Sequence, residues 1–303
     1  MKRPRRAVHG ILLLDKPAGC TSNQALQRAK RIFQAEKAGH TGSLDPLATG
    51  LLPICFGEAT KLSGYLLDAD KRYVVRAKLG EKTNTADAEG EVLSRSDAGR
   101  VQRADLAAQI PKFTGALKQI PPMVSALKHQ GERLYDLARR GEEVPREPRD
   151  IVIRRLELLA FEPPFFELDV SCTKGTYIRA LVEDLAGALG QCAHVTVLRR
   201  MELSPFTNPQ MVTLDVLEQT AEQGVQALDG LLLPLTSALA HRPQLVVNAD
   251  QQRRLKQGQA VQVTASEPVG DVVVLSETGV LLGIGLLDVS GQLTPRRWMI
   301  NTT

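Results

Sequence analysis

The first forty residues combine one apolar run with one amphipathic pattern. Residues 10 to 14 read GILLL, and this uninterrupted run predicts a short buried strand. Residues 22 to 38 predict a helix that ends at Gly39, with Arg28 and Arg31 on the face toward solvent or a ligand. Three apolar residues recur at helical spacing on the other face of this segment: Leu26, Ala29 and Phe33.

The middle of the chain alternates between strand and helix patterns. Residues 71 to 80 alternate apolar and polar positions, which predicts a half-buried strand that carries Tyr73. Residues 105 to 115 predict a helix. Residues 120 to 150 are rich in proline and basic residues, so we expect an exposed insertion there. It is either a simple surface excursion or a mobile element that grips a ligand.

Strand patterns dominate after residue 151. Two of them precede a helix pattern that begins at residue 177 and ends at Gly190, and a further strand follows. From about residue 245 the chain changes to short strands and one polar helix, separated by turns rich in glycine. This change predicts two domains, a large one over residues 1–244 and a small, β-barrel-like one over residues 245–303.

The composition is that of an ordinary globular protein. With 303 residues, 43% of them apolar and 24% charged, the chain is long enough for a large domain and a small one. The apolar run at 10 to 14 is too short for a signal peptide, and no stretch is long enough to span a membrane. Four cysteines show neither CxxC spacing nor the histidine partners of a zinc site, so we expect no metal, a cytoplasmic location and buried thiols: Cys20, Cys55, Cys172 and Cys192.

Positive charge is concentrated near the N-terminus. Residues 1 to 40 hold nine Lys and Arg against two acidic residues, a net charge of +7, although the whole chain carries only +4. The remaining residues therefore sum to −3. A concentration of this kind favours a polyanion as partner, because each neutralised phosphate releases counterions. A basic tail and helix face that are merely solvated would give the same count.

Residues 39 to 50 read GHTGSLDPLATG and place one carboxylate in a segment rich in glycine. Pro46 restrains Asp45 to an extended backbone and offers no N–H of its own, so Asp45 is better placed as a displayed side chain than as a helix cap. A structural Asp-Pro turn would look similar. Three glycines would let the loop adopt unusual backbone angles or approach a ligand closely: Gly39, Gly42 and Gly50.

The stretch GHTGSLDPLATGLLPICFGEAT resembles the catalytic motif of the TruB family of tRNA pseudouridine synthases. Further segments are similar to the family's blocks, in the family's order: GILLLDKPAGCTSN, DADKRYVVRAKLG, PPMVSALKHQGERLYDLAR, VPREPR, CTKGTYIRALVEDL and AHVTVLRR. The resemblance implies a bacterial enzyme with the α/β (α+β) pseudouridine synthase fold, in which helices flank a mixed, mostly antiparallel central sheet. It also implies a small C-terminal PUA-type RNA-binding domain.

The implied reaction detaches uracil from its ribose, turns it and rejoins it through carbon 5, without a cofactor. By resemblance, Asp45 is the nucleophile or base, at the sugar or at the ring. Arg179 matches the position of its partner; we expect it to make a forked contact and to reverse the rise in carboxylate pKa that burial causes. Tyr73 matches a catalytic tyrosine that packs on the base and assists loss of the proton from carbon 5.

The resemblance also implies a set of substrate-binding residues. Tyr177 and Leu198, together with Tyr73, match positions that contact the flipped uracil. His40 matches a histidine that fills the gap left by the flipped nucleotide. Lys16 lies in a family block, where it either supports the active-site loop or touches RNA, and no role is assigned to it.

The resemblance implies a substrate, the uridine at position 55 in the T loop of tRNA. The helix at 22 to 38 and the insertion at 120 to 150 would clamp this loop from outside, and we expect the protein to act as a monomer. The C-terminal domain has equal numbers of acidic and basic residues, so strong electrostatic binding by it is not expected. Two alternatives remain, a tRNA-binding folding chaperone without catalysis and a guide-dependent, dyskerin-like pseudouridine synthase.

Overall fold

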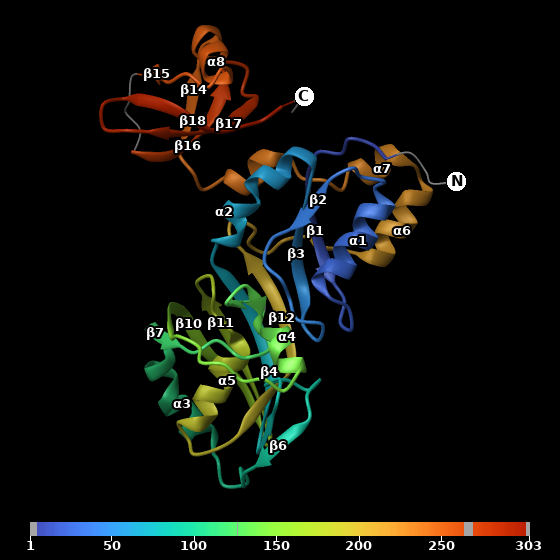
Figure 1. Ribbon diagram of the computed structural model, residues 1–303. Coiled ribbons are helices and arrows are strands. Elements are labelled where there is room, and N and C mark those ends of the chain that lie inside the picture. Colours follow the sequence, from blue (N-terminus) through green and yellow to red (C-terminus); the bar gives the residue numbers. More distant parts are fainter. Residues whose placement is uncertain (1–4, 126, 264–268, 301–303) are drawn as a thin grey trace.

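A computed structural model of the protein describes residues 5–125, 127–263 and 269–300. A nine-stranded sheet runs through most of the chain, and a second, five-stranded sheet lies near the C-terminus (Figure 1). The strands of the large sheet are β1 (Gly10–Lys16), β2 (Ala38–His40), β3 (Thr49–Phe56), β4 (Lys71–Leu79), β7 (Gly115–Gln119), β10 (Arg149–Glu162), β11 (Phe165–Cys172), β12 (Ala193–Leu203) and β13 (Val212–Thr213).

The large sheet has the order β13-β1-β3-β12-β4-β11-β10-β7, and β2 pairs with the C-terminal end of β3. Two pairs are parallel, β1 with β13 and β3 with β12, and the other pairs are antiparallel. The predicted mixed, mostly antiparallel sheet is therefore confirmed. Two small antiparallel ladders lie outside it, β5 (Glu81–Thr83) with β6 (Val92–Arg95), and β8 (Lys128–His129) with β9 (Glu132–Arg133).

Helices flank the sheet, with α1 and α6 side by side near one end and α5 against β12 and β4 nearer the other (Figure 1). The helices are α1 (Ser22–Ile32), α2 (Ser63–Leu67), α3 (Arg103–Gln109), α4 (Leu134–Arg139), α5 (Ile178–Gly187), α6 (Leu214–Glu222), α7 (Val225–Asp229) and α8 (Ala249–Lys256), with 3-10 turns η1 (Gly57–Leu62), η2 (Ile110–Phe113) and η3 (Leu235–Leu239). In the described ranges, every helix is too short or too polar to serve as a membrane-spanning segment.

The predicted strand at 71 to 80 is β4, the fifth strand along the sheet order. Its residues alternate strictly between buried and half-buried, with Tyr73, Val75 and Ala77 facing the core. Apolar side chains of one strand face gain stability by leaving water, while Arg72 and Arg76 on the other face keep 30% and 40% of their side chains exposed. The central strand thus supplies a buried tyrosine at its N-terminal end.

The helix predicted at 22 to 38 is shorter than expected. Its apolar face is buried as predicted, but α1 ends at Ile32, and Gln34 adopts a positive φ of 53° that turns the chain away. Gly39 does not end a helix, because it lies in β2 and pairs with Cys55 of β3. Hydrogen bonding to β3 replaces the last predicted helical turn.

Two other predicted helices are also interrupted. Pro111 divides the pattern at 105 to 115, so that α3 ends at Gln109 and a 3-10 turn follows. Helix α5 ends at Gly187, three residues before Gly190, whose positive φ of 68° belongs to the turn that follows. In each case the predicted type of element is right and its end is wrong.

The segment at 120 to 150 contains β8, β9 and α4, and most of its described residues are exposed or half-exposed. It is not merely a solvated excursion, because Leu134 and Leu137 of α4 are buried. Its described part therefore has a small apolar contact surface of its own.

The C-terminal sheet consists of β14 (Gln244–Val247), β15 (Val261–Gln262), β16 (Gly270–Ser276), β17 (Leu281–Leu287) and β18 (Gln292–Trp298). Their order is β14-β16-β17-β18-β15. The outermost strands, β14 and β15, do not pair with each other within the described residues, so the sheet is a curled half-barrel, consistent with a PUA-like domain.

The C-terminal sheet packs against the large sheet. Val273, Leu281 and Ile284 belong to one buried cluster with Ile11 and Leu51 of β1 and β3. A polar contact adds to this packing, since Nζ of a lysine in η1 donates to a carbonyl of β18 across 2.9 Å. The two sheets therefore share part of one hydrophobic core.

The expectation of four buried thiols is only half right. Cys55 and Cys172 are buried, whereas Cys20 and Cys192 are half-exposed. All four thiols are free. Burial raises the pKa of Cys55 to about 12 and that of Cys172 to about 11, because the thiolate is poorly solvated there.

Candidate active site

The loop between β2 and β3 displays Asp45. Leu44 anchors this loop, because its N–H donates to Oγ of Ser22 across 2.8 Å and its carbonyl accepts from the same hydroxyl across 3.0 Å. The backbone of Asp45 then forms a turn with Ala48. Its side chain keeps 41% of its surface exposed, so the predicted display of the carboxylate is confirmed.

Two of the three loop glycines need their special conformation. Gly42 and Gly50 have positive φ angles of 73° and 96°. A Cβ on Gly50 would lie 2.3 Å from the carbonyl oxygen of Arg200. Gly39 has no positive φ, and a Cβ there would meet nothing within 4 Å, so the prediction of unusual backbone angles is wrong for Gly39, and its close approach to a ligand stays a prediction. The close approach at Gly50 is to protein backbone.

Lys16 supports the loop that carries Asp45, and its side chain is fully buried. Its Nζ donates to the carbonyl oxygens of Pro17, Cys20 and Pro46 at 2.8, 2.6 and 3.2 Å. Loss of hydration lowers the pKa of Lys16, and the nearby Asp45 carboxylate opposes this shift. Of the two open roles for Lys16, the contacts are those of loop support.

Arg179 contacts the displayed carboxylate from the first turn of α5. Its Nε lies 2.9 Å from Oδ2 of Asp45, and its side chain is only 4% exposed. The predicted fork on the carboxylate is absent, because Nη1 donates to the carbonyl of Thr85 at 2.6 Å and Nη2 to that of Val124 at 2.9 Å. The guanidinium is thus fixed by three separate segments of the chain.

Asp87 is a second carboxylate beside Arg179, and the sequence analysis missed it. Its Oδ2 lies 3.7 Å from Nη1 of Arg179, and its side chain is 5% exposed. The hydroxyl of Thr85 and the N–H of Glu89 both donate to its Oδ1. In the sequence, Asp87 is one acidic residue in a segment rich in turn residues. Acidic residues in such segments are common on protein surfaces, so the sequence did not distinguish it.

The pKa of Asp45 is raised above its ordinary value. Loss of hydration is the main cause, and repulsion from Asp87 adds to it. Attraction to Arg179 and Lys16 acts in the opposite direction but is the weaker influence. The expectation that Arg179 reverses the effect of burial is therefore wrong.

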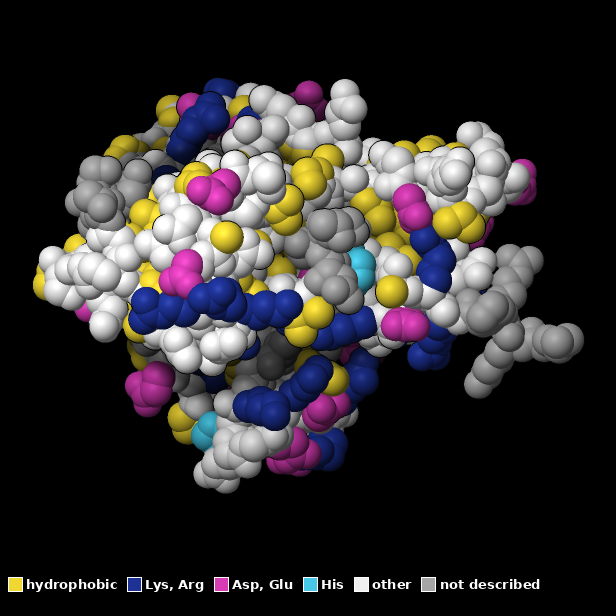
Figure 2. All heavy atoms as spheres, turned by 90° about the horizontal axis from the view of Figure 1, so that it is seen from above, with side chains coloured by type: hydrophobic (Ala, Val, Ile, Leu, Met, Phe, Trp, Pro, Cys, Tyr) yellow, Lys and Arg dark blue, Asp and Glu magenta, His cyan; other side chains and the backbone are white. Residues whose placement is uncertain are grey.

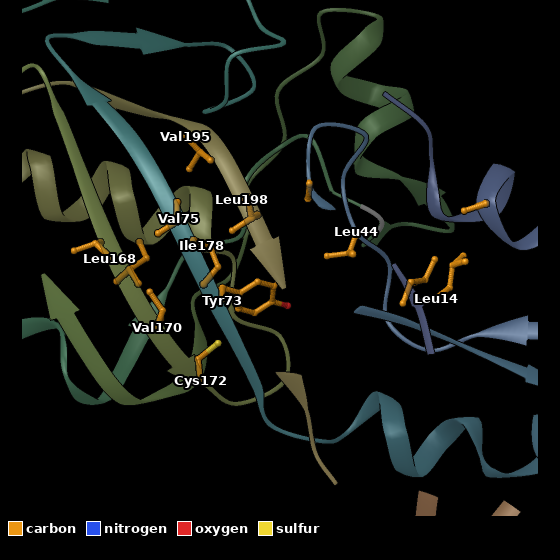
Figure 3. Packing of buried hydrophobic residues seen from close by; sticks show 14 of the residues in the cluster. Leu14, Leu44, Tyr73, Val75, Leu168, Val170, Cys172, Ile178, Val195 and Leu198 are labelled. Atoms are coloured by element: carbon orange, nitrogen blue, oxygen red, sulfur yellow. The ribbon is translucent and has the colours of Figure 1, made fainter. Parts of the chain in front are cut away.

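Tyr73 and Leu198 lie on the neighbouring strands β4 and β12, next to Ile178 at the start of α5 (Figure 3). The hydroxyl of Tyr73 points out of this apolar group, toward the side on which Leu44 lies (Figure 3). Leu198 is 6% exposed and belongs to the core cluster. Burial raises the pKa of Tyr73, so its hydroxyl stays protonated at neutral pH.

Arg200 connects the loop to Tyr73, and it too was missed. Its positive charge acts on the hydroxyl of Tyr73 and opposes the rise in the pKa of that tyrosine, its Nε donates to the carbonyl of Leu51 at 2.6 Å, and its Nη2 donates to that of Gly42 at 3.0 Å. The residue is 1% exposed. It stands two positions after Leu198 in VLRR, but sequence alone does not tell a buried arginine from an exposed one.

His40 and Tyr177 stand shortly before Asp45 and Arg179 in the chain. His40 lies in β2, and its Nδ1 is buried without a hydrogen-bond partner among the described residues. Burial and the charge of Arg200 lower the pKa of His40, so its ring is neutral at neutral pH. Tyr177 immediately precedes α5, and burial raises its pKa.

Positive charge on the surface of the molecule is partly compensated. Figure 2 shows Lys and Arg side chains in several groups on one face, with Asp and Glu side chains among them. Arg28 of α1, expected to face solvent or a ligand, is paired with Glu218 of α6 at 2.9 Å. In the part of the chain that the structure covers, no group of three or more His, Cys, Asp or Glu could hold a metal ion.

Family models match almost the whole chain. Residues 30–178 match the TruB family pseudouridylate synthase N-terminal domain, and residues 179–240 match the tRNA pseudouridylate synthase B C-terminal domain. Residues 243–299 match the C-terminal domain of pseudouridine synthase II TruB. The three matches follow one another without overlap.

Relatives and solved structures agree with these matches. The chain is 52% identical to tRNA pseudouridine synthase B of Pseudomonas aeruginosa (strain UCBPP-PA14), over 98% of both chains. It is 53% identical to the protein of that name from Stutzerimonas stutzeri (strain A1501), over 98% of this chain and 97% of the relative. A chain from an H/ACA RNP bound to a substrate RNA has a similar fold, with a TM-score of 0.75 at 23% identity over 97% of this chain and 86% of that one. The protein therefore belongs to the TruB family of pseudouridine synthases.

Proposed function

We propose that the protein converts the uridine at position 55 in the T loop of tRNA to pseudouridine, with Asp45 as nucleophile or base. The contact between Asp45 and Arg179 is the observation that carries this proposal. It joins a displayed carboxylate to a buried cation, and Leu44, the residue before Asp45, lies on the side toward which the hydroxyl of Tyr73 points (Figure 3). The names of the relatives, which are tRNA pseudouridine synthases, support the class of substrate.

The isomerisation adds and removes no atoms. The bond between carbon 1′ of the ribose and N1 of uracil breaks, and a bond from carbon 1′ to carbon 5 forms. Carbon 5 loses its proton, and N1 ends with one. Asp45 attacks carbon 1′ of the ribose or carbon 6 of the ring, and both routes need its ionised form. No cofactor enters either route.

The target uridine must leave its stack to reach Asp45. Tyr73 offers a ring for stacking, Leu198 an apolar contact and Tyr177 a further edge of the pocket. A neutral His40 fills the space left in the RNA loop, since a neutral ring costs less to bury than a charged one. The hydroxyl of Tyr73, which the charge of Arg200 influences, assists loss of the proton from carbon 5.

Two segments clamp the RNA from outside in this proposal. Arg31 of α1 is exposed, whereas Arg28 is tied to Glu218, so α1 offers less free charge than its sequence suggests. The insertion at 120 to 150 supplies the second contact. The C-terminal sheet contributes little charge, because Arg296 is paired with Asp271 at 3.2 Å. The enzyme acts as a monomer in the cytoplasm.

A substitution that keeps the shape of Asp45 tests the proposal. Purified wild type should convert the T-loop uridine of a T-arm transcript, read as reverse-transcription stops after carbodiimide labelling. The Asp45→Asn variant should lose at least about 1,000-fold in rate. Asp215→Asn serves as a matched control, because that carboxylate lies on α6 with 85% of its side chain exposed. Conversion by the Asp45→Asn variant at the control's rate would refute the assigned role.

The same assay separates the alternatives. A folding chaperone would bind the tRNA transcript and leave its uridine unchanged. A guide-dependent enzyme would modify RNA only when a guide RNA and partner proteins are added. Conversion of free transcript by the purified chain alone is the result that we expect.

A further inference from the structure

Gln119 makes an unusual pair of contacts at the end of β7. The residue is 4% exposed. Its Oε1 accepts from the backbone N–H of Tyr177 at 2.8 Å, and its Nε2 donates to the carbonyl of Tyr177 at 3.0 Å. One side-chain amide therefore binds both backbone groups of one residue, as a neighbouring strand would. Both groups of the amide are satisfied without water.

Tyr177 is the residue from which α5 begins. It is the N-cap of this helix, and its own side chain makes no capping hydrogen bond. Helix starts normally rely on a local Ser, Thr, Asp or Asn at this place. Here Gln119 binds the cap residue from another part of the fold, and so it fixes where α5 starts relative to the sheet. Arg179 stands two residues further on.

A second contact joins the same segment to α5. The carbonyl of Val124, five residues after Gln119, accepts the hydrogen bond from Nη2 of Arg179. Between them Pro121 and Pro122 restrict the backbone to extended conformations. The stretch QIPPMVS thus meets α5 at the helix start and at the guanidinium that contacts Asp45.

We infer that Gln119 is a positioning residue, which sets Tyr177 and Arg179 at the distances that the isomerisation needs. The inference rests on the proposed function, since it assigns these two residues to that reaction. Gln119 itself does not touch the RNA. A displacement of α5 by about 1 Å would lengthen the contact to Asp45, and misplacement of that size costs about 100-fold in rate.

Only glutamine meets this requirement among side chains of similar size. Glutamate keeps the acceptor for the N–H of Tyr177 but has no donor for its carbonyl. Methionine has a similar length and offers neither. The Gln119→Met variant therefore removes both contacts, and the Gln119→Glu variant removes one of them while it keeps the side-chain size.

The test separates chemistry from RNA binding. Single-turnover rates are measured by tritium release from carbon 5 of uridine in a labelled T-arm transcript, and affinities by filter binding. Gln119→Met should lower the single-turnover rate about 10- to 100-fold, with Kd within about threefold of wild type. Gln119→Glu should lower the rate in the same direction. The matched control is Gln226→Met at an exposed position of α7, a helix outside the proposed RNA contacts, which should leave both quantities unchanged.

The experiment distinguishes failure of the inference about Gln119 from failure of the proposed function. If wild type releases no tritium, the proposed function itself is wrong. If wild type is active and both Gln119 variants react at its rate, the inference is wrong. Losses in rate that equal the losses in affinity would also overturn it, since they would make Gln119 part of RNA binding. Should Gln119→Met fail to fold, as judged by thermal melting, Gln119→Glu alone decides between these outcomes.

Discussion

Nε of Arg179 forms an ion pair with Oδ2 of Asp45 across 2.9 Å, yet the pKa of that carboxyl stays above its ordinary value. A single ion-pair contact would lower it. Although 41% of the side chain is exposed, the carboxyl has lost part of its hydration, and Arg179 shares its charge with Asp87. A carboxylate with a raised pKa is a stronger base and nucleophile than an ordinary one, provided that it is ionised.

The acid limb of the rate profile should report this shift. The reaction needs ionised Asp45, so the single-turnover rate should fall as the pH decreases through the raised pKa of Asp45. The limb should therefore lie above the ordinary value of 3.8. Rates measured across about pH 4 to 8, on enzyme shown by circular dichroism to be folded, test this. A rate that stays constant down to the ordinary carboxyl range would contradict it.

The Asp87→Asn variant should shift this limb to lower pH. Removing the neighbouring negative charge leaves less repulsion against ionised Asp45, so the pKa of Asp45 decreases. The rate at neutral pH should also fall, about tenfold, because Arg179 loses a charge that helps to hold it. The exposed Glu91 offers the control Glu91→Gln, whose profile should match wild type. An unchanged or upward-shifted limb in Asp87→Asn would mean that repulsion from Asp87 does not set this pKa.

The residues that the sequence analysis found and missed differ in one physical respect. Asp45 and Arg179 stand in motifs that resemble a known family, so their contact could be expected from sequence. Asp87 and Arg200, which were missed, and Lys16, whose role was left open, take their importance from what surrounds them in space, and the chain order contains no record of those neighbours. Backbone donors and acceptors from distant segments surround Lys16 and Arg200, and periodicity along the chain does not locate them.

The elements of the fold were largely predictable, and their ends were not. Alternation identified β4, and helical spacing identified the apolar face of α1. Sheet pairing decided where α1 had to stop, since Gly39 pairs with Cys55. Competition of this kind between local propensity and a distant hydrogen-bond partner cannot be read from the local pattern alone.

Replacing Lys16 should destabilise the loop that carries Asp45. The Lys16→Met variant leaves the carbonyls of Pro17, Cys20 and Pro46 without this donor. The free energy of unfolding should fall by about 3 kcal/mol in urea titrations, with a matching loss of activity. Lys37→Met removes an exposed ammonium from the same part of the sequence and should leave the free energy of unfolding almost unchanged. Equal stability of the two variants would show that the buried ammonium does not hold the loop.

Gly50 and Gly39 form a matched pair within one motif. Gly50→Ala should lower the free energy of unfolding by at least about 3 kcal/mol, because its Cβ would press on the backbone of Arg200 at 2.3 Å and its φ is 96°. Gly39→Ala should stay within about 1 kcal/mol of wild type, since its Cβ meets open space. Urea titrations compare the two variants, and T-arm conversion shows whether Gly39 serves close approach to RNA instead. A Gly39→Ala variant that is stable but inactive would assign that glycine to the substrate, whereas a stable Gly50→Ala variant would disprove the backbone contact.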